Sequence, residues 1–247
     1  MTSAAKVFAI LDLFSEDRQL LNPDEINEQL GYSRATGYRY VKELVDAGFL
    51  QKVSARFYSL GPRIIELDYQ LKHSDPLLLA ANPEMEKLAS DTGFDTVLSI
   101  YFSGAMKVMD THRCSIQPQL KLSYGRGRSR PLFRSAAPKV LIASLPRSSL
   151  KKVYELNSEE IKAHKMGHTW DEFRSELQRI QKLGYYISLG EIDHDVGAMA
   201  VPVYNEEGDV IAALALVGNL DDIRYADTEE LKNKLQITTT NISKALL

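Results

Sequence analysis

The 247-residue chain has one cysteine, Cys114, which excludes a framework of internal disulfides. A single cysteine fits a reducing compartment, so we expect a cytoplasmic protein. No run approaches the ~20 consecutive apolar residues that a membrane-spanning helix needs, so no membrane partner is expected. The short apolar patch near the N-terminus is followed at once by acidic residues and has no small-residue cleavage site, so it does not predict a signal peptide.

The chain also lacks an excess of positive charge. Its net charge of -3 and pI near 6.0 argue against indiscriminate binding of nucleic acid, which is a polyanion. The charge is uneven, however, because residues 33–63 contain six basic and two acidic residues, a local net charge of +4. A basic patch on a mildly acidic chain favours a sequence-specific DNA binder that uses two copies to hold its site, although a solvated basic surface is the alternative.

Residues 22–47 predict two short helices joined by a tight turn. Asn22 suits the cap of the first helix and Pro23 its first position. Gly31 suits the left-handed residue that ends this helix, and Ser33 can cap the next one. This is the pattern of a helix-turn-helix, which also occurs in ordinary helical cores.

The second helix of this pair has two different faces. One face is expected to be buried and carries Tyr38, Val41, Leu44 and Val45 at helical spacing. The other face is rich in hydrogen-bond donors and carries Arg34, Thr36, Arg39, Tyr40 and Lys42. A helix with donors on its free face is suited to the major groove of DNA.

A hairpin is predicted directly after this helix, with strands at residues 49–52 and 57–60. A hairpin in that place is a wing, and Arg56 near its tip can reach a phosphate or the minor groove. With Arg39 expected on a phosphate, and Tyr38 either in the core or on the DNA, the predicted DNA-binding residues are Ser33, Arg34, Thr36, Tyr38, Arg39, Tyr40 and Arg56.

The chain has room for two domains, and its 44% apolar and 26% charged residues are typical of globular proteins. A helix at residues 3–14 is expected to pack on the helix pair, and a linker helix begins at residue 63. The remaining segments alternate. Strands are expected at residues 96–102, 106–111, 120–124, 185–188, 196–204 and 210–217. Helices are expected at residues 76–89 (interrupted at Pro83), 138–145, 148–156 and 170–183 and after Asp227. This pattern predicts an α+β domain.

Three polar clusters were weighed as metal or catalytic sites. Residues 110–114 contain Asp, His and Cys, residues 164–168 contain two His, and residues 190–195 contain carboxylates and a His. None has the spacing of a standard zinc site or a complete set of nucleophile and base. We therefore interpret them as polar strand ends or loops and expect no catalytic residue, metal ion or cofactor.

Residues 125–139 form a fourth cluster, in which several arginines precede a small-residue turn and a helix expected to begin at Pro138. Free N–H groups at the start of a helix favour an anion, and Arg126, Arg130 or Arg134 could add positive charge. This arrangement favours a ligand site over a plain solvated loop.

Several motifs in one order resemble the IclR family, the isocitrate-lyase-regulator type of bacterial transcription factor. They are SRATGYRYVKEL at 33–44, AGFL at 47–50, YSLG at 58–61, PL at 131–132, AAPKVLIA at 136–143, LGY at 183–185, GE at 190–191, VGAMAVPV at 196–203 and Gly218. The resemblance covers nearly the whole chain. One departure is Pro138, which stands where the family has Gly and which offers no N–H to a ligand.

This resemblance implies a winged helix-turn-helix at residues 1–62, a linker helix at 63–75 and a GAF-like effector-binding domain at 76–247. It also implies dimers or tetramers that bind operator DNA of catabolic operons and respond to small organic acids or aromatics.

The family's effector pocket corresponds here to a turn and four strand positions, namely Arg134, Ser135, Ala136 and Ala137 with Ser188, Ala198, Ala215 and Val217. Three of the four strand positions are apolar, which predicts an aromatic or otherwise hydrophobic carboxylate as effector.

Two other functions remain open at this point. The C-terminal part could be an enzyme that uses Glu191, His194 or Cys114. Alternatively, the winged helix could bind a partner protein, although its basic face speaks against this.

Overall fold

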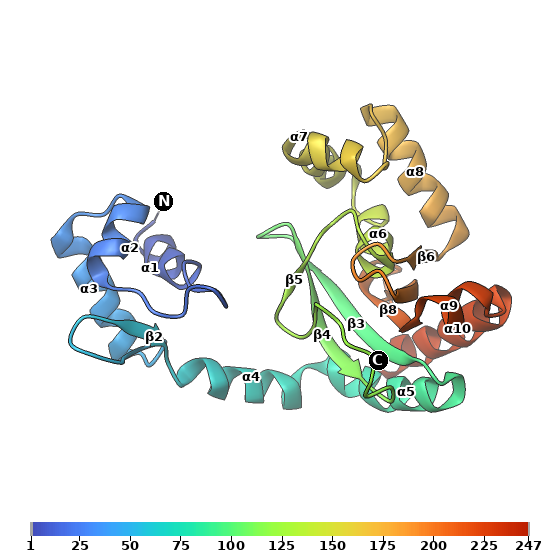
Figure 1. Cartoon of the computed structure of the whole chain (residues 1–247), viewed down its shortest axis with the longest axis horizontal. Coiled ribbons are helices and arrows are strands. Elements are labelled where there is room, and N and C mark those ends of the chain that lie inside the picture. The colour runs from blue at the N-terminus through green and yellow to red at the C-terminus, as the bar shows by residue number, and fades with distance from the viewer. Residues whose placement is uncertain (1, 247) are drawn as a thin grey trace. The chain divides into compact units, whose positions relative to one another are not determined.

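The computed structural model describes residues 2–246 and divides the chain into two compact units, Met1–Asp75 and Pro76–Leu247 (Figure 1). In the described part of the chain, no helix is both long and apolar enough to cross a membrane.

The first unit is a winged helix-turn-helix, as predicted. Its elements are α1 (Ser3–Leu11), α2 (Pro23–Leu30), α3 (Arg34–Asp46), β1 (Leu50–Lys52), β2 (Tyr58–Leu60) and α4 (Arg63–Ser74). The Asn22 side chain accepts hydrogen bonds from the N–H groups of Asp24 and Glu25, and Glu25 accepts one from Asn22 N at 3.0 Å. Gly31 ends α2 with a φ of 67°. These local signals place the helix ends where the sequence predicts them.

The buried face of α3 differs from the predicted one. It consists of Gly37, Tyr40, Val41 and Leu44, which follow the spacing i, i+3, i+4, i+7. Tyr40 is 4% exposed and its ring meets that of Tyr32 edge-on at 5.8 Å, whereas Tyr38 is 43% exposed. The expectation that Tyr40 lies on the free face and Tyr38 in the core is therefore wrong.

Gly37 explains this orientation of α3. A Cβ at this position would lie 1.5 Å from Oδ1 of Asn27 on α2. The absence of a side chain therefore lets the two helices approach closely along the face that carries Gly37. The small core that results contains Ile10, Leu21, Ile26, Tyr40, Val41, Leu44 and Leu50.

The second unit is α+β, as predicted. Its helices are α5 (Pro76–Thr92), α6 (Ala136–Ala143), α7 (Arg147–Ala163), α8 (Trp170–Leu183), α9 (Leu220–Tyr225) and α10 (Thr228–Ala245). Its strands are β3 (Asp95–Phe102), β4 (Lys107–Cys114), β5 (Ser129–Arg130), β6 (Tyr186–Leu189), β7 (Val196–Tyr204) and β8 (Val210–Asn219). They form one antiparallel sheet in the order β5-β4-β3-β8-β7-β6.

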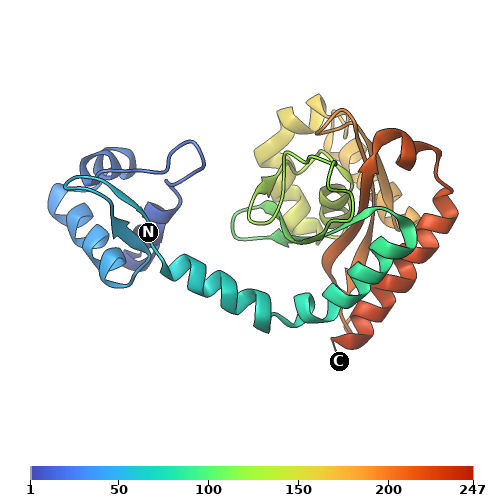
Figure 2. The ribbon, with the colours of Figure 1, turned by 60° about the horizontal axis from the view of Figure 1, so that its bottom comes forward.

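Helices cover both faces of this sheet (Figures 1 and 2). One core packs α6, α7 and α8 on the face that carries Ala198 and Ala200 of β7. The other packs α5, α9 and α10 on the face that carries Met199 and Val201. Successive side chains of a strand point to opposite faces of the sheet. Because helices cover both faces, β7 is buried along nearly its whole length.

Three expectations for this unit are wrong, and one helix was missed. Residues 120–124 form no strand; the buried side chains of Leu120 and Tyr124 instead anchor a loop. Helix α5 continues through Pro83, because its buried side chains outweigh the one hydrogen bond that a proline removes. Helix α6 begins at Ala136, so Pro138 lies in its first turn, where backbone N–H groups have no helical partner in any case. Helix α9 was not predicted.

Candidate functional sites

The exposed side of α3 holds most of the predicted DNA-binding residues. Ser33 caps the helix, accepting from Thr36 N at 3.3 Å and donating to Thr36 Oγ1 at 2.9 Å. Arg34 and Arg39 are exposed and lie 3.9 Å from Asp24 and 3.8 Å from Glu43. Exposed ion pairs of this kind contribute little, so both guanidinium groups can exchange these partners for phosphate.

The wing lies beside this helix. A cavity of about 500 Å³ between them is lined by Tyr38, Arg39, Val41, Lys42, Val45, Lys52 and Tyr58. Arg56 is exposed near the tip of the hairpin, which is closed by a hydrogen bond from Val53 N to Phe57 O at 2.9 Å. The structure thus brings together the predicted residues of α3 except Tyr40, whose ring is buried under the Arg39 guanidinium at 5.1 Å.

In the second unit, the predicted turn carries an unusual residue. Ser135, the residue before α6, has φ 72° and ψ 165°, a conformation that is ordinarily reserved for glycine. Its N–H donates to Oε2 of Glu191 at 2.8 Å, and its hydroxyl accepts from Nη2 of Arg130 at 2.6 Å. Two polar contacts therefore meet at one strained residue.

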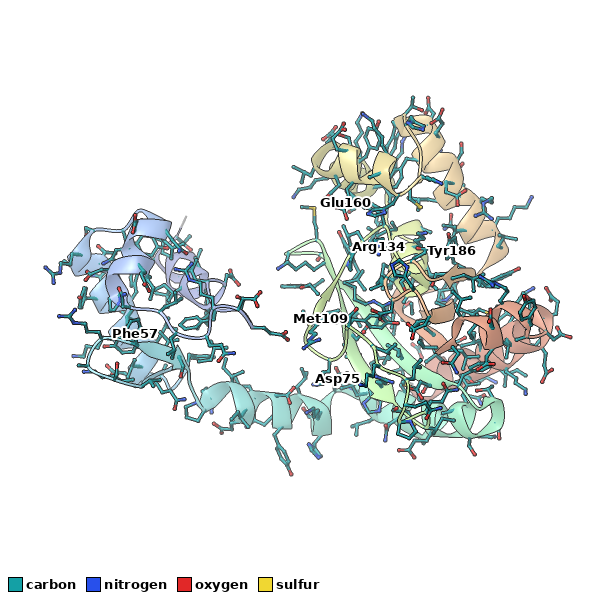
Figure 3. All side chains as sticks on the ribbon, viewed as in Figure 1. Phe57, Asp75, Met109, Arg134, Glu160 and Tyr186 are labelled. Carbon is teal, nitrogen blue, oxygen red and sulfur yellow. The ribbon has the colours of Figure 1, made fainter. Side chains whose placement is uncertain are left out.

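Lys139 on α6 completes the contacts to Glu191. Its ammonium lies 2.9 and 2.8 Å from Oε1 and Oε2 of Glu191 and 2.9 Å from the Tyr186 hydroxyl. Tyr186 also donates to Glu191 Oε1 at 3.2 Å, and Arg134 donates to the Glu191 carbonyl. Figure 3 shows Arg134 and Tyr186 in this region. The place where the sequence predicts a ligand's carboxylate is thus occupied by a carboxylate of the chain itself.

A second charged pair, Arg130 and Asp110, lies on the other side of Ser135. Arg130 Nη1 and Asp110 Oδ1 are 3.1 Å apart, and their side chains are 1% and 2% exposed. Ser99 donates to Asp110 at 2.7 Å, and the guanidinium lies 3.8 Å from the Tyr124 ring centre. Among the described residues, Asp110 Oδ2 and Arg130 Nε have no hydrogen-bond partner. Burial raises the pKa of Tyr124, so its hydroxyl stays neutral.

A cavity of about 490 Å³ adjoins Lys139 and Glu191. It is lined by Phe133, Arg134, Lys139, Ala163, His164, Lys165, Met166, Glu176, Tyr186, Gly190, Glu191 and His194. The sequence did not indicate most of these residues as ligand contacts. They come mainly from α6, α8, β6 and the loops after α7 and β6, and only the fold brings these segments together. Its volume lies within the ordinary range for small-molecule sites.

The predicted strand positions lie together but do not line this cavity. The sheet register places Ser188, Ala198 and Val217 in one row across β6, β7 and β8. Ala215 lies two residues further along the same face, and all four are buried. Of the predicted turn, Ser135, Ala136 and Ala137 are buried as well, and only Arg134 lines the cavity.

Of the residues considered for catalysis, Glu191 and His194 line the cavity and Cys114 lies on β4. Burial, together with the negative charges of Glu86 and Asp95, raises the pKa of the Cys114 thiol, so it is a poor nucleophile. Across residues 2–246, no group of three or more His, Cys, Asp or Glu side chains is placed to hold a metal ion.

The fold defines a winged helix-turn-helix protein with a C-terminal α+β domain. The model of the IclR helix-turn-helix domain matches residues 3–54, and that of the bacterial transcriptional regulator IclR C-terminal domain matches residues 70–244. The chain therefore belongs to the IclR family of DNA-binding transcriptional regulators.

Several family members resemble it over most of its length. The regulator XynR of Escherichia coli is 28% identical over 99% of this chain and 96% of its own. The p-hydroxybenzoate hydroxylase transcriptional activator of Acinetobacter baylyi is 29% identical over 85% of this chain and 78% of its own.

Solved structures share the fold. An IclR family regulator from Brucella abortus has a TM-score of 0.80 at 22% identity, covering 100% of this chain and 93% of its own. An IclR homologue from Microbacterium hydrocarbonoxydans, complexed with 4-hydroxybenzoate, has a TM-score of 0.74 at 23% identity and covers 99% of both chains.

Proposed function

We propose that this protein regulates a catabolic operon by binding operator DNA through its first unit and a small organic acid through its second. The observation that carries the first part is the exposed side of α3, where Arg34, Thr36 and Arg39 lie beside a wing. Arg34 and Thr36 approach bases, and Arg39 contacts a phosphate. We assign residues 1–62 to DNA binding, 63–75 to a linker helix and 76–247 to effector binding.

The composition of the cavity supports an aromatic or otherwise hydrophobic acid as effector. Ala163 offers apolar surface with the buried Phe133 and Met166 beside it in the lining, while Arg134 and Lys165 offer positive charge. A site with an apolar body and a few cations suits a single ring that carries a carboxylate. Two similar proteins support this class, because the relative from Acinetobacter baylyi is a p-hydroxybenzoate hydroxylase transcriptional activator and the homologue from Microbacterium hydrocarbonoxydans is complexed with 4-hydroxybenzoate.

We further propose that the protein acts as a dimer or a dimer of dimers. Helix α4 has no buried residue although it carries Ile65 and Tyr69, which are 74% and 64% exposed, and Phe8 on α1 is 56% exposed. Large apolar side chains on one unit suit a subunit interface. Two copies would match a two-fold operator, which a single helix-turn-helix cannot hold tightly.

A mobility-shift assay with the DNA upstream of the neighbouring operon tests this function. We expect a discrete complex with that fragment in the presence of excess unrelated DNA, and we expect one acid from an aromatic acid panel to change its stability and to raise the thermal unfolding temperature. Equal binding to all DNA fragments would contradict a regulator. An acid that is chemically converted during incubation would favour an enzyme instead.

A further inference from the structure

Glu191 occupies an anion site formed by Ser135, Lys139 and Tyr186. Its carboxylate receives the Ser135 N–H, two contacts from the Lys139 ammonium and the Tyr186 hydroxyl, all within 3.2 Å. Lys139 is 4% exposed, so its charge needs a negative partner at all times. An acid that enters this region meets a site whose donors are already engaged by a carboxylate of the same chemistry.

The cavity lies directly in front of these donors, because Lys139, Tyr186 and Glu191 all line it. Two of its carboxylates are neutralised, since Glu191 pairs with Lys139 and Glu176 pairs with Arg179. The charged lining residues that remain are Arg134 and Lys165, both basic. The cavity therefore attracts an anion even while Glu191 is in place.

A second buried cation holds Ser135 in place. The Arg130 side chain is 1% exposed and its Nη2 donates to Ser135 Oγ. Arg130 is not among the residues that line the cavity, so it fixes the turn before α6 and is not itself a ligand contact.

The position of Glu191 suits a side chain that can be displaced. Its side chain is already 24% exposed, against 5% for Lys139, so the carboxylate lies at the solvent side of the pair and gains hydration when it leaves. It follows Gly190, whose φ of 67° allows a tight turn, and it belongs to the short loop between β6 and β7. The end of this loop is tied to α9, because Leu220 N donates to Asp195 O at 2.7 Å.

From these observations we propose that the effector binds in this cavity and that its carboxylate replaces that of Glu191 on Lys139 and the Ser135 N–H. This proposal rests on the proposed effector response and specifies its chemistry. The ligand is a single-ring aromatic monocarboxylate, and Glu191 is an internal competitor that holds the empty site together. Displacement frees the Glu191 side chain from α6, which gives the effector a way to favour a second conformation of the loop.

The test measures binding of benzoate, 4-hydroxybenzoate and neutral benzamide by calorimetry to the full chain and to Glu191→Gln. An internal competitor reduces the fraction of binding-competent protein, so its removal raises the apparent affinity. We expect Glu191→Gln to bind the tighter of the two acids about tenfold more tightly than the wild type, with no gain for benzamide. Lys139→Met should lose binding of both acids.

Glu176→Gln is the matched control, because it removes the same charge from the same cavity without touching Lys139. An equal gain in both glutamine variants would overturn displacement in favour of general electrostatics. An unchanged or weaker affinity for both acids in Glu191→Gln, or binding of neither acid to any form of the protein, would overturn the proposal as well.

Two further measurements complete the design. If Glu191→Gln does not fold, Tyr186→Phe replaces it, because this variant removes one hydrogen-bond donor from Glu191. It should raise the affinity for the acids by a smaller factor. No rise in affinity would overturn the proposal. Operator binding of each variant is measured in parallel. Intact operator binding without the predicted gain rejects Glu191 displacement alone, whereas the absence of operator binding by the wild-type protein rejects the proposed function.

Discussion

The two units differ in that only the second has a buried ion pair among the pairs described below. In the first unit the cations stand at the surface, where Arg34 and Arg39 are loosely paired with exposed carboxylates. In the second unit Arg130 and Lys139 are buried and paired at close range. Exposed, weakly held cations suit a large polyanion that arrives from outside. Buried cations with fixed partners suit a small ligand that must be recognised inside the fold.

The hydrophobic cores of the two units also differ, because the core of the first unit is much smaller. The first unit has one small core of three helices and a short hairpin, and α4 adds no buried residue. The second unit packs helices on both faces of a six-stranded sheet. The first unit therefore depends on a small core, and its exposed apolar residues Ile65 and Tyr69 suit a partner surface.

The largest expected effect comes from breaking a buried pair. Arg130→Met leaves the Asp110 carboxylate buried without its cation, which should cost about 3–5 kcal/mol of unfolding free energy. Urea unfolding followed by far-ultraviolet circular dichroism, which reports on the helices of both units, measures this loss. Arg34→Met, which breaks an exposed pair, is the control and should change stability by less than about 1 kcal/mol. Equal losses in both variants would remove the contrast between the units.

A smaller effect is expected from filling the contact between α2 and α3. Gly37→Ala places a methyl group 1.5 Å from Asn27 Oδ1, which should destabilise the first unit by about 1–3 kcal/mol. Hydrogen exchange of the α2 and α3 amides should rise while that of β7 stays unchanged. Gly125→Ala is the control, because nothing lies within 4 Å of its added carbon. Unchanged exchange in α2 and α3 would contradict the close approach.

The exposed apolar residues of α4 give the third prediction. Ile65→Asp places a charge where a second subunit is expected, so self-association should weaken at least about tenfold, equivalent to 1.4 kcal/mol. Analytical ultracentrifugation measures this against Ile237→Asp, a change at an exposed isoleucine of α10 in the second unit. A wild-type protein that is strictly monomeric at micromolar concentration, with and without DNA, would refute the proposed dimer.

The sequence predicted the first unit well because its signals are local. Asn22, Gly31 and Ser33 act within a few residues of their own position, and the structure places each of them at the predicted helix end. The predicted faces of Tyr38 and Tyr40 are wrong because the helix can be rotated so that either tyrosine ring packs in the core, and both rotations leave an amphipathic pattern. The contact of Gly37 with Asn27, which decides between them, is a tertiary feature.

The effector region was less predictable for the same reason. The turn before α6 was recognised from its arginines and small residues, but its contacts come from residues far along the chain. Lys139 and Glu191 are separated by 52 positions, and Glu191 alone is indistinguishable from any polar loop residue. The sequence could therefore indicate an anion site but not the carboxylate that fills it.

The proposed contact between α3 and DNA is tested most directly by the salt dependence of operator binding. Arg39 and Arg179 are both exposed and both paired with a glutamate on their own helix, so Arg179→Ala of the second unit is a matched control for Arg39→Ala. Fluorescence anisotropy at several salt concentrations should show that Arg39→Ala weakens binding to all sequences and lowers the salt slope by about one unit. Arg179→Ala should leave both unchanged. An unaltered affinity and an unaltered salt slope for Arg39→Ala would contradict a contact between Arg39 of α3 and DNA.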